Sequence, residues 1–303
     1  MPPLRIGLIG WGTVGSALGG LIEAGPLPLE LVSVAVRDAA RERSRALPDG
    51  VRIGLPEDVD VVVELAGGVD EPLAWARETL KRGIPYVTAN KALLATHGDE
   101  LSQLARANHA ALLGSASVGG GTPMIEVVEH LAATGEIDSL RGIVNATTTY
   151  ILTAMGEGRS YADALRAAQE AGYAEADPSF DVEGRDAAQK LAILGSVAWG
   201  RWRGEDEVDG SGIVGVGVQP GETIRLVAEA TRERMTVAPM QLQLGSPLAG
   251  VSGIENMLEV VVAGATFRIS GPGAGGRVTA GAVYGDIARL VAGARPILFG
   301  GAS

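Results

Sequence analysis

The sequence has no cysteine and only three histidines, and both shortages narrow the range of functions. Without cysteine, disulfides, thiol catalysis and thiolate metal sites are excluded. The histidines, His97, His109 and His130, show no metal-ligand spacing, which argues against a zinc site. The absence of thiols is typical of a cytoplasmic protein, and the opening residues Met-Pro-Pro-Leu-Arg show no secretory pattern.

Lysine is as scarce as histidine. Of the 25 lysine and arginine residues only three are lysines, Lys81, Lys91 and Lys190. Arginine stays protonated, whereas a lysine ammonium can shift its pKa and exchange a proton. A lysine that remains in such a sequence is therefore a candidate for a position that arginine does not suit.

Composition is that of a globular protein, and the length is sufficient for two domains. Hydrophobic residues make up 46% of the 303 positions and charged residues 20%. The net charge of −11 argues against nucleic acid or an anionic membrane as a partner. The charge-free run from Met235 to Ile254 contains two prolines and several glycines, so we interpret it as strand and loop rather than a membrane span.

The N-terminal segment has the pattern of a dinucleotide-binding turn. A buried strand is expected over Leu4 to Ile9 and a helix over Ser16 to Ala24. Between them a GxGxxG sequence provides a tight turn, close approach of a pyrophosphate and close packing of helix on strand. The alternative is a plain structural turn. The residues expected to bind the cofactor are Gly10, Gly12, Thr13, Val14 and Gly15.

The end of the second expected strand, Leu31 to Val36, bears on the choice of cofactor. An acid there holds the ribose of NAD, whereas an arginine suits the 2′-phosphate of NADP. Arg37 and Asp38 stand side by side, and Arg41 and Arg43 follow. We favour NADP or NADPH over NAD or NADH. The alternative is that these arginines form the solvated face of the next helix.

Three further strand ends carry candidate residues. Strands are expected over residues 60–65, 85–88 and 110–113, and ligands gather at the carboxyl ends of such strands. Gly67 follows the first and Lys91 the second, so Lys91 ranks above Lys81, which is expected on the outer face of a helix. Three consecutive glycines after the third indicate a backbone that passes close to a ligand, cofactor or cation.

The segment from Gly172 to Leu191 contains an acidic loop followed by a helix. Pro178 prevents a regular helix in its first half, and the apolar spacing from Gly184 onward predicts one in the second. Asp186 and Lys190 are four apart and share a helix face. Such a place can hold an amino-bearing molecule and move a proton. The alternative is an exposed ion pair worth about 0.3–0.5 kcal/mol.

These patterns predict an α/β protein with a Rossmann-type nucleotide-binding domain and a second α+β domain. We expect the first over residues 1–117, joined by the C-terminal helix at about 279–303. The second, over 118–278, is expected to bind substrate, to form the dimer contact and to contain a mixed or antiparallel sheet.

The motifs resemble those of the homoserine dehydrogenase family. The resemblance is collinear from Leu4 to about Leu290 and is most specific around Lys190, whereas the nucleotide loop is shared with many dehydrogenases. The segments that carry it are Gly10–Gly15, Thr88–Leu93, Ala116–Pro123, Gly142–Leu152, Gly172–Leu191 and Gly271–Gly275.

The resemblance implies an NAD(P)-dependent reduction of L-aspartate 4-semialdehyde to L-homoserine, in the threonine and methionine branch of biosynthesis. Lys190, aided by Asp186, would exchange a proton with the substrate oxygen. Lys91 would bind substrate and help to polarise its carbonyl near the nicotinamide. The other residues given binding roles are Glu175 for the substrate ammonium, Asp181 in the same polar network, Thr147 in the substrate pocket, and Gly273 and Gly275 near the cofactor.

The sequence departs from the family pattern at three positions. Ala146 stands where glycine is common and Thr149 where asparagine is common. Ser115 stands where many members have an acid that helps to hold a monovalent cation, Na⁺ or K⁺. The backbone carbonyls expected for that cation are those of Val118, Gly120 and Thr122.

The remaining expectations concern partners and rivals. We expect a small-molecule substrate and a homodimer or homotetramer. No regulatory or kinase domain accompanies the resemblance, so feedback inhibition through an added domain is not expected. Two alternatives stay open: another Rossmann-type amino-acid dehydrogenase, and a nucleotide-sensing protein derived from one. The presence of both Lys91 and Lys190 argues against the sensing protein.

Overall fold

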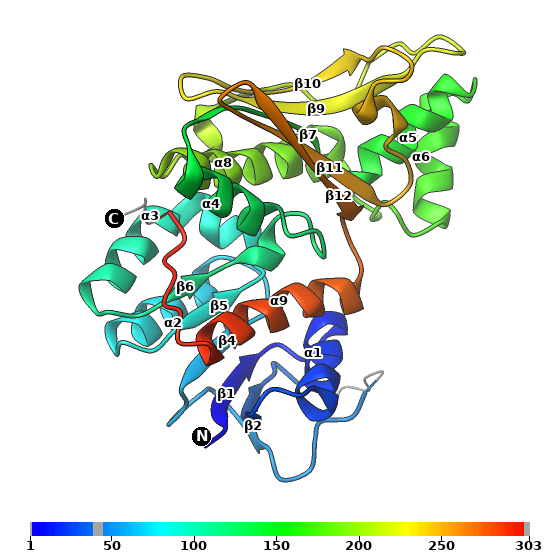
Figure 1. The fold of residues 1–303 in the computed structure, drawn as a ribbon. Coiled ribbons are helices and arrows are strands. Elements are labelled where there is room, and N and C mark those ends of the chain that lie inside the picture. The colour runs from blue at the N-terminus through cyan, green and yellow to red at the C-terminus, as the bar shows by residue number, and fades with distance from the viewer. Residues whose placement is uncertain (1, 39–44, 300–303) are drawn as a thin grey trace. The chain divides into compact units, whose positions relative to one another are not determined.

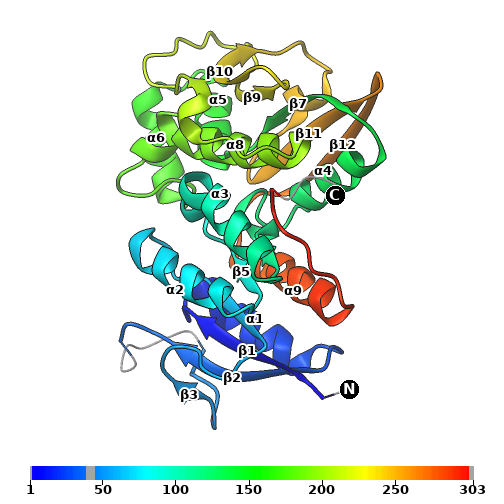
Figure 2. The same cartoon turned by 90° about the vertical axis from the view of Figure 1, so that its left-hand side faces the viewer.

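The computed structural model describes residues 2–38 and 45–299, which form two compact units (Figures 1 and 2). Unit 1 takes the described residues up to Pro123 and those from Gly275 onward, and unit 2 comprises Met124–Ala274. Arg41 and Arg43 lie outside the described residues. Among the described residues, no helix is long and apolar enough to cross a membrane.

Unit 1 is built on a parallel sheet. Within the described residues, six strands pair in the order β3-β2-β1-β4-β5-β6. Central strands of this kind are apolar on both faces because helices cover both. The strands are β1 (Leu4–Ile9), β2 (Leu29–Ala35), β3 (Arg52–Ile53), β4 (Val61–Glu64), β5 (Tyr86–Thr88) and β6 (Leu112–Leu113).

The helices of unit 1 complete its core. Ile6 and Val63 of the sheet pack in one cluster with Leu18 of α1 and Val283 of α9, so the last helix contributes to the core of unit 1. The predicted Rossmann-type fold is confirmed. The helices are α1 (Thr13–Ala24), α2 (Asp70–Lys81), α3 (Lys91–Ala107), the short 3₁₀ helix η1 (Ser115–Ser117) and α9 (Gly276–Val291).

Unit 2 contains a mixed sheet, also as predicted. Its strands pair in the order β12-β11-β7-β9-β10-β8, antiparallel throughout except for the parallel pair β10 and β8. The strands are β7 (Ile137–Ile143), β8 (Val208–Gly210), β9 (Ile224–Ala230), β10 (Met235–Gln241), β11 (Glu255–Val262) and β12 (Ala265–Pro272). The run from Met235 to Ile254 therefore begins as a strand, and 3₁₀ helix η3 and loop follow it.

Helix α8 lies at the centre of unit 2, and most of its side chains are buried. It packs against α4, α7 and strands β7 to β10. The helices of this unit are α4 (Met124–Thr134), α5 (Ala146–Gly156), α6 (Tyr161–Glu170), α7 (Ser179–Val182) and α8 (Arg185–Trp199), with η2 (Glu205–Glu207) and η3 (Pro247–Gly250).

Two local differences from the sequence prediction matter for the site. The threonine-rich segment forms helix α5, which was not predicted, because Asn145 caps it by accepting from Thr148 N at 2.8 Å. The first half of the acidic segment also contains one helical turn, α7, which starts directly after Pro178. Proline is tolerated at that place, since a first turn has no partner for its N–H groups.

Candidate active site

The glycine turn between β1 and α1 leaves room for a pyrophosphate. A Cβ on Gly12 would meet no atom within 4 Å, and Gly12 precedes α1 without a side-chain cap. In contrast, a Cβ on Gly15 would lie 2.2 Å from the Gly10 oxygen, and Gly10 has a φ of +101°. The first turn, with Thr13 and Val14, thus fits the phosphates of a dinucleotide.

The glycine-rich segment from Gly271 to Gly276 crosses from unit 2 into unit 1 between Ala274 and Gly275. In unit 1, Gly275 has a φ of +130°, and a Cβ on Gly276 would lie 2.4 Å from Thr13 of the nucleotide turn. In unit 2, a Cβ on Gly273 would lie 2.3–2.6 Å from the amide atoms of Asn256. Only glycine fits at these close approaches.

Arg37 lies just after β2, where a ribose phosphate would be recognised. Its side chain is 80% exposed, and its guanidinium is 3.4 Å from the carboxylate of Glu71. A surface pair of this kind contributes little to stability and leaves the guanidinium able to reorient toward an anion. Arg37 therefore remains suited to a 2′-phosphate.

Lys91 is the first residue of α3 and is partly buried. The preceding Asn90 caps the helix by accepting from Leu93 N at 3.1 Å. Lys81, in contrast, is exposed at the end of α2. Gly67 has a φ of +71°, and a Cβ there would meet nothing within 4 Å, so the turn after β4 demands glycine for its conformation rather than for space.

Lys190 and Asp186 form a buried ion pair in unit 2. Nζ of Lys190 is 2.9 Å from Oδ2 of Asp186, with the two side chains 13% and 10% exposed. Nζ also donates to the Val144 carbonyl at 2.6 Å. The alternative of an exposed pair is therefore wrong. An ammonium group has three protons. Asp186 and the Val144 carbonyl accept two of them, so the third can be donated to another acceptor.

Asn145 donates hydrogen bonds to two carboxylates, those of Asp181 and Asp186. Its Nδ2 donates to Oδ1 of Asp181 at 2.7 Å and to Oδ2 of Asp186 at 2.8 Å, and the residue is only 4% exposed. Asn145 is not among the site residues predicted from the sequence. The signal that was available is an asparagine directly before the threonine run, since asparagine is a favoured N-cap.

Thr147 belongs to the same cluster, whereas Glu175 stands apart from it. Oγ1 of Thr147 lies 2.6 Å from the Tyr173 carbonyl and 3.0 Å from Oδ2 of Asp181, and its single proton serves one of them at a time. Glu175 is exposed, and its side chain makes no hydrogen bond or ion pair within the described part of the chain. Its carbonyl accepts from Gln169.

The acidic loop is folded by local contacts. Asp177 accepts from Ser179 N at 3.0 Å, and hydrogen bonding by Ser179 lowers the pKa of the Asp177 carboxyl. Gly184, with a φ of +84°, joins α7 to α8. Ile213 N donates to the Val182 carbonyl at 2.7 Å, and a Cβ on Gly212 would lie 2.0 Å from that oxygen. These contacts fix the start of α8, the helix that carries Lys190.

Ser115, which stands where an acid is common, faces a carboxylate instead. Its N–H and its hydroxyl donate to Asp286 of α9 at 3.0 and 2.7 Å. Gly119 and Gly120 both have positive φ, and Thr122 N donates to the Gly119 carbonyl at 2.9 Å. In the described ranges, no group of three or more His, Cys, Asp or Glu side chains is arranged to hold a metal ion.

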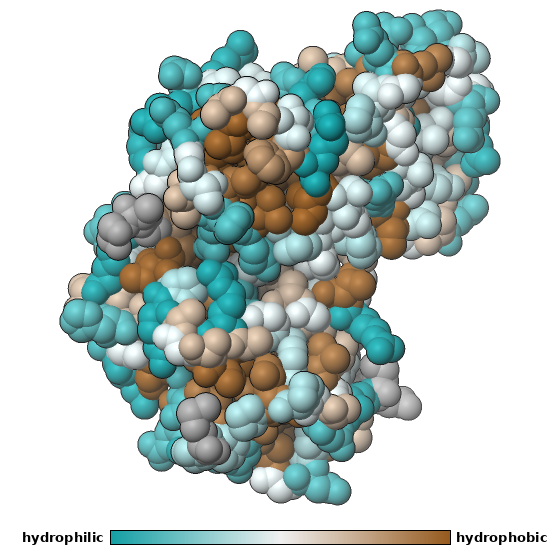
Figure 3. All heavy atoms as spheres, in the orientation of Figure 1, coloured by the Kyte–Doolittle hydropathy of each residue, from teal (hydrophilic) through white to brown (hydrophobic). Residues whose placement is uncertain are grey.

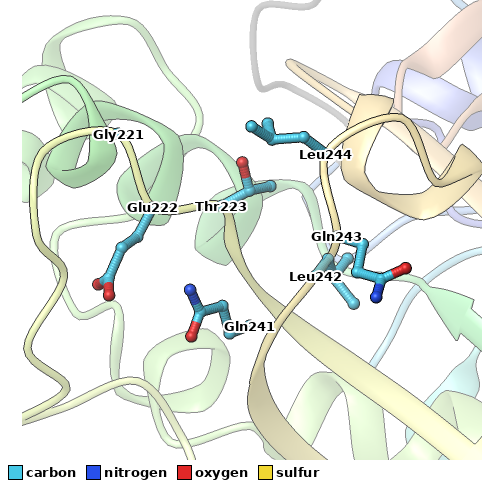
Figure 4. A pocket seen from close by; sticks show the side chains of 7 residues that line it. All are labelled: Gly221, Glu222, Thr223, Gln241, Leu242, Gln243 and Leu244. Atoms are coloured by element: carbon cyan, nitrogen blue, oxygen red, sulfur yellow. The ribbon is translucent and has the colours of Figure 1, made fainter.

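A surface hollow in unit 2 lies between the ends of β9 and β10 (Figure 4). Of its lining residues only Glu222 is titratable, and Figure 4 shows its side chain pointing away from Leu244. The Glu222 carboxylate accepts from Gln219 N at 2.8 Å. The hollow contains none of the predicted site residues. We therefore assign the chemistry to the cluster formed by Lys190, Asp186, Asn145, Asp181 and Thr147.

Comparison with known proteins gives one family throughout. Residues 10–114 match the model for the homoserine dehydrogenase NAD binding domain, and residues 123–288 match that for homoserine dehydrogenase. Homoserine dehydrogenase of Corynebacterium glutamicum is 39% identical over 93% of this chain and 70% of its own length. That of Lactococcus lactis is 35% identical over 95% and 74%.

Solved structures agree. A hyperthermophilic archaeal homoserine dehydrogenase in complex with NADPH is 30% identical and aligns with a TM-score of 0.86, covering 97% of this chain and 99% of its own. The enzyme from Thiobacillus denitrificans aligns at 0.87 with 29% identity, covering 96% and 74%. The chain has the NAD(P)-binding and catalytic parts of these oxidoreductases and belongs to the homoserine dehydrogenase family.

Proposed function

We propose that the chain interconverts L-aspartate 4-semialdehyde and L-homoserine with a nicotinamide cofactor. The observation that carries the proposal is the ammonium of Lys190, which is buried and held by Asp186 and by the Val144 carbonyl, with one proton that no described residue accepts. A hydroxyl or carbonyl oxygen is the natural acceptor for that proton.

The chemistry needs a hydride and a proton. A nicotinamide cofactor held by the glycine turn and Arg37 would supply the hydride for the aldehyde carbon, or would accept it in the reverse direction. Lys190 donates the proton to the carbonyl oxygen as negative charge develops there, and it takes the proton back when the alcohol is oxidised. Asp186 fixes the ammonium in place and stabilises its charge. The aldehyde thereby becomes an alcohol, and the reduced nicotinamide is oxidised.

The substrate ammonium requires a carboxylate. Asp181 accepts from Asn145 and Thr147 and has further lone pairs for a ligand. Glu175 follows Tyr173 in the exposed acidic loop, so its side chain is able to turn toward a ligand in solvent. We assign the ammonium to these two acids, and Thr147 to the wall of the pocket.

The cofactor assignment rests on unit 1. The turn formed by Gly10 to Gly15, the exposed Arg37 and the partly buried Lys91 support a dinucleotide with a 2′-phosphate, NADP or NADPH. A monovalent cation at the carbonyls of Val118, Gly120 and Thr122 stays part of the proposal. A dependence of the rate on K⁺ or Na⁺ at constant ionic strength tests it.

We further infer that the nucleotide domain corresponds to unit 1, that the substrate domain corresponds to unit 2, and that the chain forms a homo-oligomer through unit 2. On the edge strand β12, Phe267 is 45% exposed, and Figure 3 shows brown, hydrophobic residues over the part of unit 2 where β11 and β12 lie. An exposed apolar area of this kind is typical of an interaction surface. The mass in solution tests this, and the cytoplasmic location stays a prediction.

The activity is tested by following nicotinamide absorbance with L-homoserine, L-serine and an alcohol of the same length without an amino group. The proposal predicts that, of these three compounds, only L-homoserine is oxidised. It also predicts a higher rate with NADP than with NAD. Arg37→Ala would lower that preference, whereas Arg52→Ala, in another exposed pair with Glu57, would not. Equal turnover of serine would indicate a different amino-acid dehydrogenase.

A further inference from the structure

Unit 1 contains a fully buried carboxylate for which the mechanism above has no use. Glu64 ends β4 and is 0% exposed. Oε1 accepts from Ala66 N at 2.7 Å and from Gly67 N at 3.0 Å, and Oε2 accepts from the Thr88 hydroxyl at 2.7 Å. A charge in such a place is costly unless it is hydrogen-bonded in this way.

The contacts of Glu64 continue to the lysine that follows β5. Thr88 Oγ1, which donates to Glu64, accepts from Asn90 N at 2.9 Å. The Asn90 amide donates to the Gly68 carbonyl at 2.6 Å while its oxygen caps α3. Two hydrogen-bonded links therefore connect the turn after β4 to the start of α3. One runs from Glu64 through Thr88 to the Asn90 N–H, and the other joins the Gly68 carbonyl to the Asn90 amide. Lys91 is the next residue after Asn90.

The direction of the Thr88 hydroxyl explains why an acid is needed. Thr88 accepts from Asn90 N, so its own proton must go to an acceptor, and Glu64 is that acceptor. A glutamine at position 64 would present its amide hydrogens either to Thr88 or to the N–H groups of Ala66 and Gly67. With the amide hydrogens toward Thr88, the Thr88 hydroxyl proton has no acceptor. With them toward Ala66 and Gly67, donors face donors, and in both cases the place has no access to water.

We propose that Glu64, acting through Thr88 and Asn90, is a positioning residue that fixes Lys91 against the nucleotide-side turn at Gly67. It touches neither reactant. The inference rests on the role given to Lys91 in the proposed function. What it adds is a reason that Lys91 is held in one place: the start of its helix is anchored on a buried carboxylate.

The test is a thermodynamic cycle on cofactor affinity, with the dissociation constant of NADPH read from nicotinamide fluorescence. Thr88→Val keeps the shape and removes the hydroxyl, whereas Thr88→Ser keeps the hydroxyl. We expect Thr88→Val to weaken binding about tenfold and Thr88→Ser to restore it to within about twofold. In a Lys91→Ala background, Thr88→Val should change the dissociation constant of NADPH by less than about twofold. The reason is that the lysine side chain that Thr88→Val displaces is no longer present.

Equal losses in the Val and Ser variants, or a tenfold loss that persists without Lys91, would overturn the inference. A Lys91→Ala variant that binds NADPH like the wild type would overturn it too. Should Thr88→Val not fold, Asn90→Ser gives the same cycle, because serine keeps the helix cap and loses only the bond to Gly68. The readout needs no homoserine, so a failure of the proposed substrate is seen separately.

Discussion

Lys190 and Asp186 lie 2.9 Å apart on one face of α8, in a place where only about a tenth of each side chain is exposed. A surface pair at this spacing adds a few tenths of a kcal/mol, roughly 0.3–0.5 kcal/mol, whereas breaking a buried pair leaves an uncompensated charge. The same sequence spacing thus has a different consequence here. The pair holds the ammonium of Lys190 in a fixed position.

The first prediction concerns the charge of Asp186. Asp186→Asn keeps the shape but no longer stabilises the ammonium of Lys190, so we expect kcat for homoserine oxidation to fall about 100-fold or more. Steady-state kinetics at saturating NADP measures it. The matched control is Asp163→Asn, which breaks an exposed pair with Arg166 at 3.0 Å and should leave kcat unchanged. A loss of less than about threefold at Asp186 would contradict the prediction.

The second prediction separates the two roles of Asn145. Asn145→Ala removes both the cap of α5 and the donors to Asp181 and Asp186, so stability and activity should both fall. Asn145→Ser keeps a capping oxygen and should recover about 1 kcal/mol of unfolding free energy in urea. Its activity should stay about tenfold below wild type, because one hydroxyl proton cannot serve two carboxylates. Recovery of both together would mean that Asn145 only caps the helix.

The third prediction contrasts two glycines of the nucleotide turn. Gly12→Ala places a methyl group in open space, so the protein should fold normally and bind NADPH about tenfold more weakly. Gly15→Ala places one 2.2 Å from the Gly10 oxygen, so the melting temperature should drop. Calorimetry and fluorescence titration measure the two effects. A Gly12→Ala variant with unchanged affinity would argue against a pyrophosphate at this turn.

The fourth prediction is a pH dependence of stability. Burial, and next the charge of Glu64, raise the pKa of the Tyr86 hydroxyl well above its ordinary value of 10.0. Above about pH 10 the unfolded chain loses this proton while the folded chain keeps it, so the free energy of unfolding falls as the pH rises. Tyr86→Phe should remove about 1.4 kcal/mol per pH unit of that slope in urea unfolding. Equal slopes in both proteins would contradict the assignment.

The sequence predicts the two sheets and the glycine turn because their signals are local. Leu4 to Ile9 is a strand with the predicted bounds, and α1 begins three residues earlier than the predicted Ser16 because the helix extends into the glycine turn. Lys91 lies at a strand end, as expected from the order of elements. These features follow from periodicity and from glycine, which act within a few residues.

The missed features depend on contacts between distant segments. Whether Asp186 and Lys190 are exposed depends on the Val144 carbonyl, which is more than 40 residues away in the chain, and no spacing rule gives it. Helix α5 was missed because threonine is a weak helix former, and tertiary packing overrides that preference. The role of Asn145 depends on Asp181 and Asp186, which lie 36 and 41 residues further along the chain.

The central claim is that Lys190 moves the proton, and one substitution tests it most directly. Lys190→Arg keeps the positive charge but replaces an ammonium that exchanges its proton with a guanidinium that stays protonated. We predict that homoserine oxidation by this variant is about 100-fold slower or more, with the dissociation constant of NADPH within about twofold of wild type. Turnover at a wild-type rate would contradict the account and would place the proton transfer on another group.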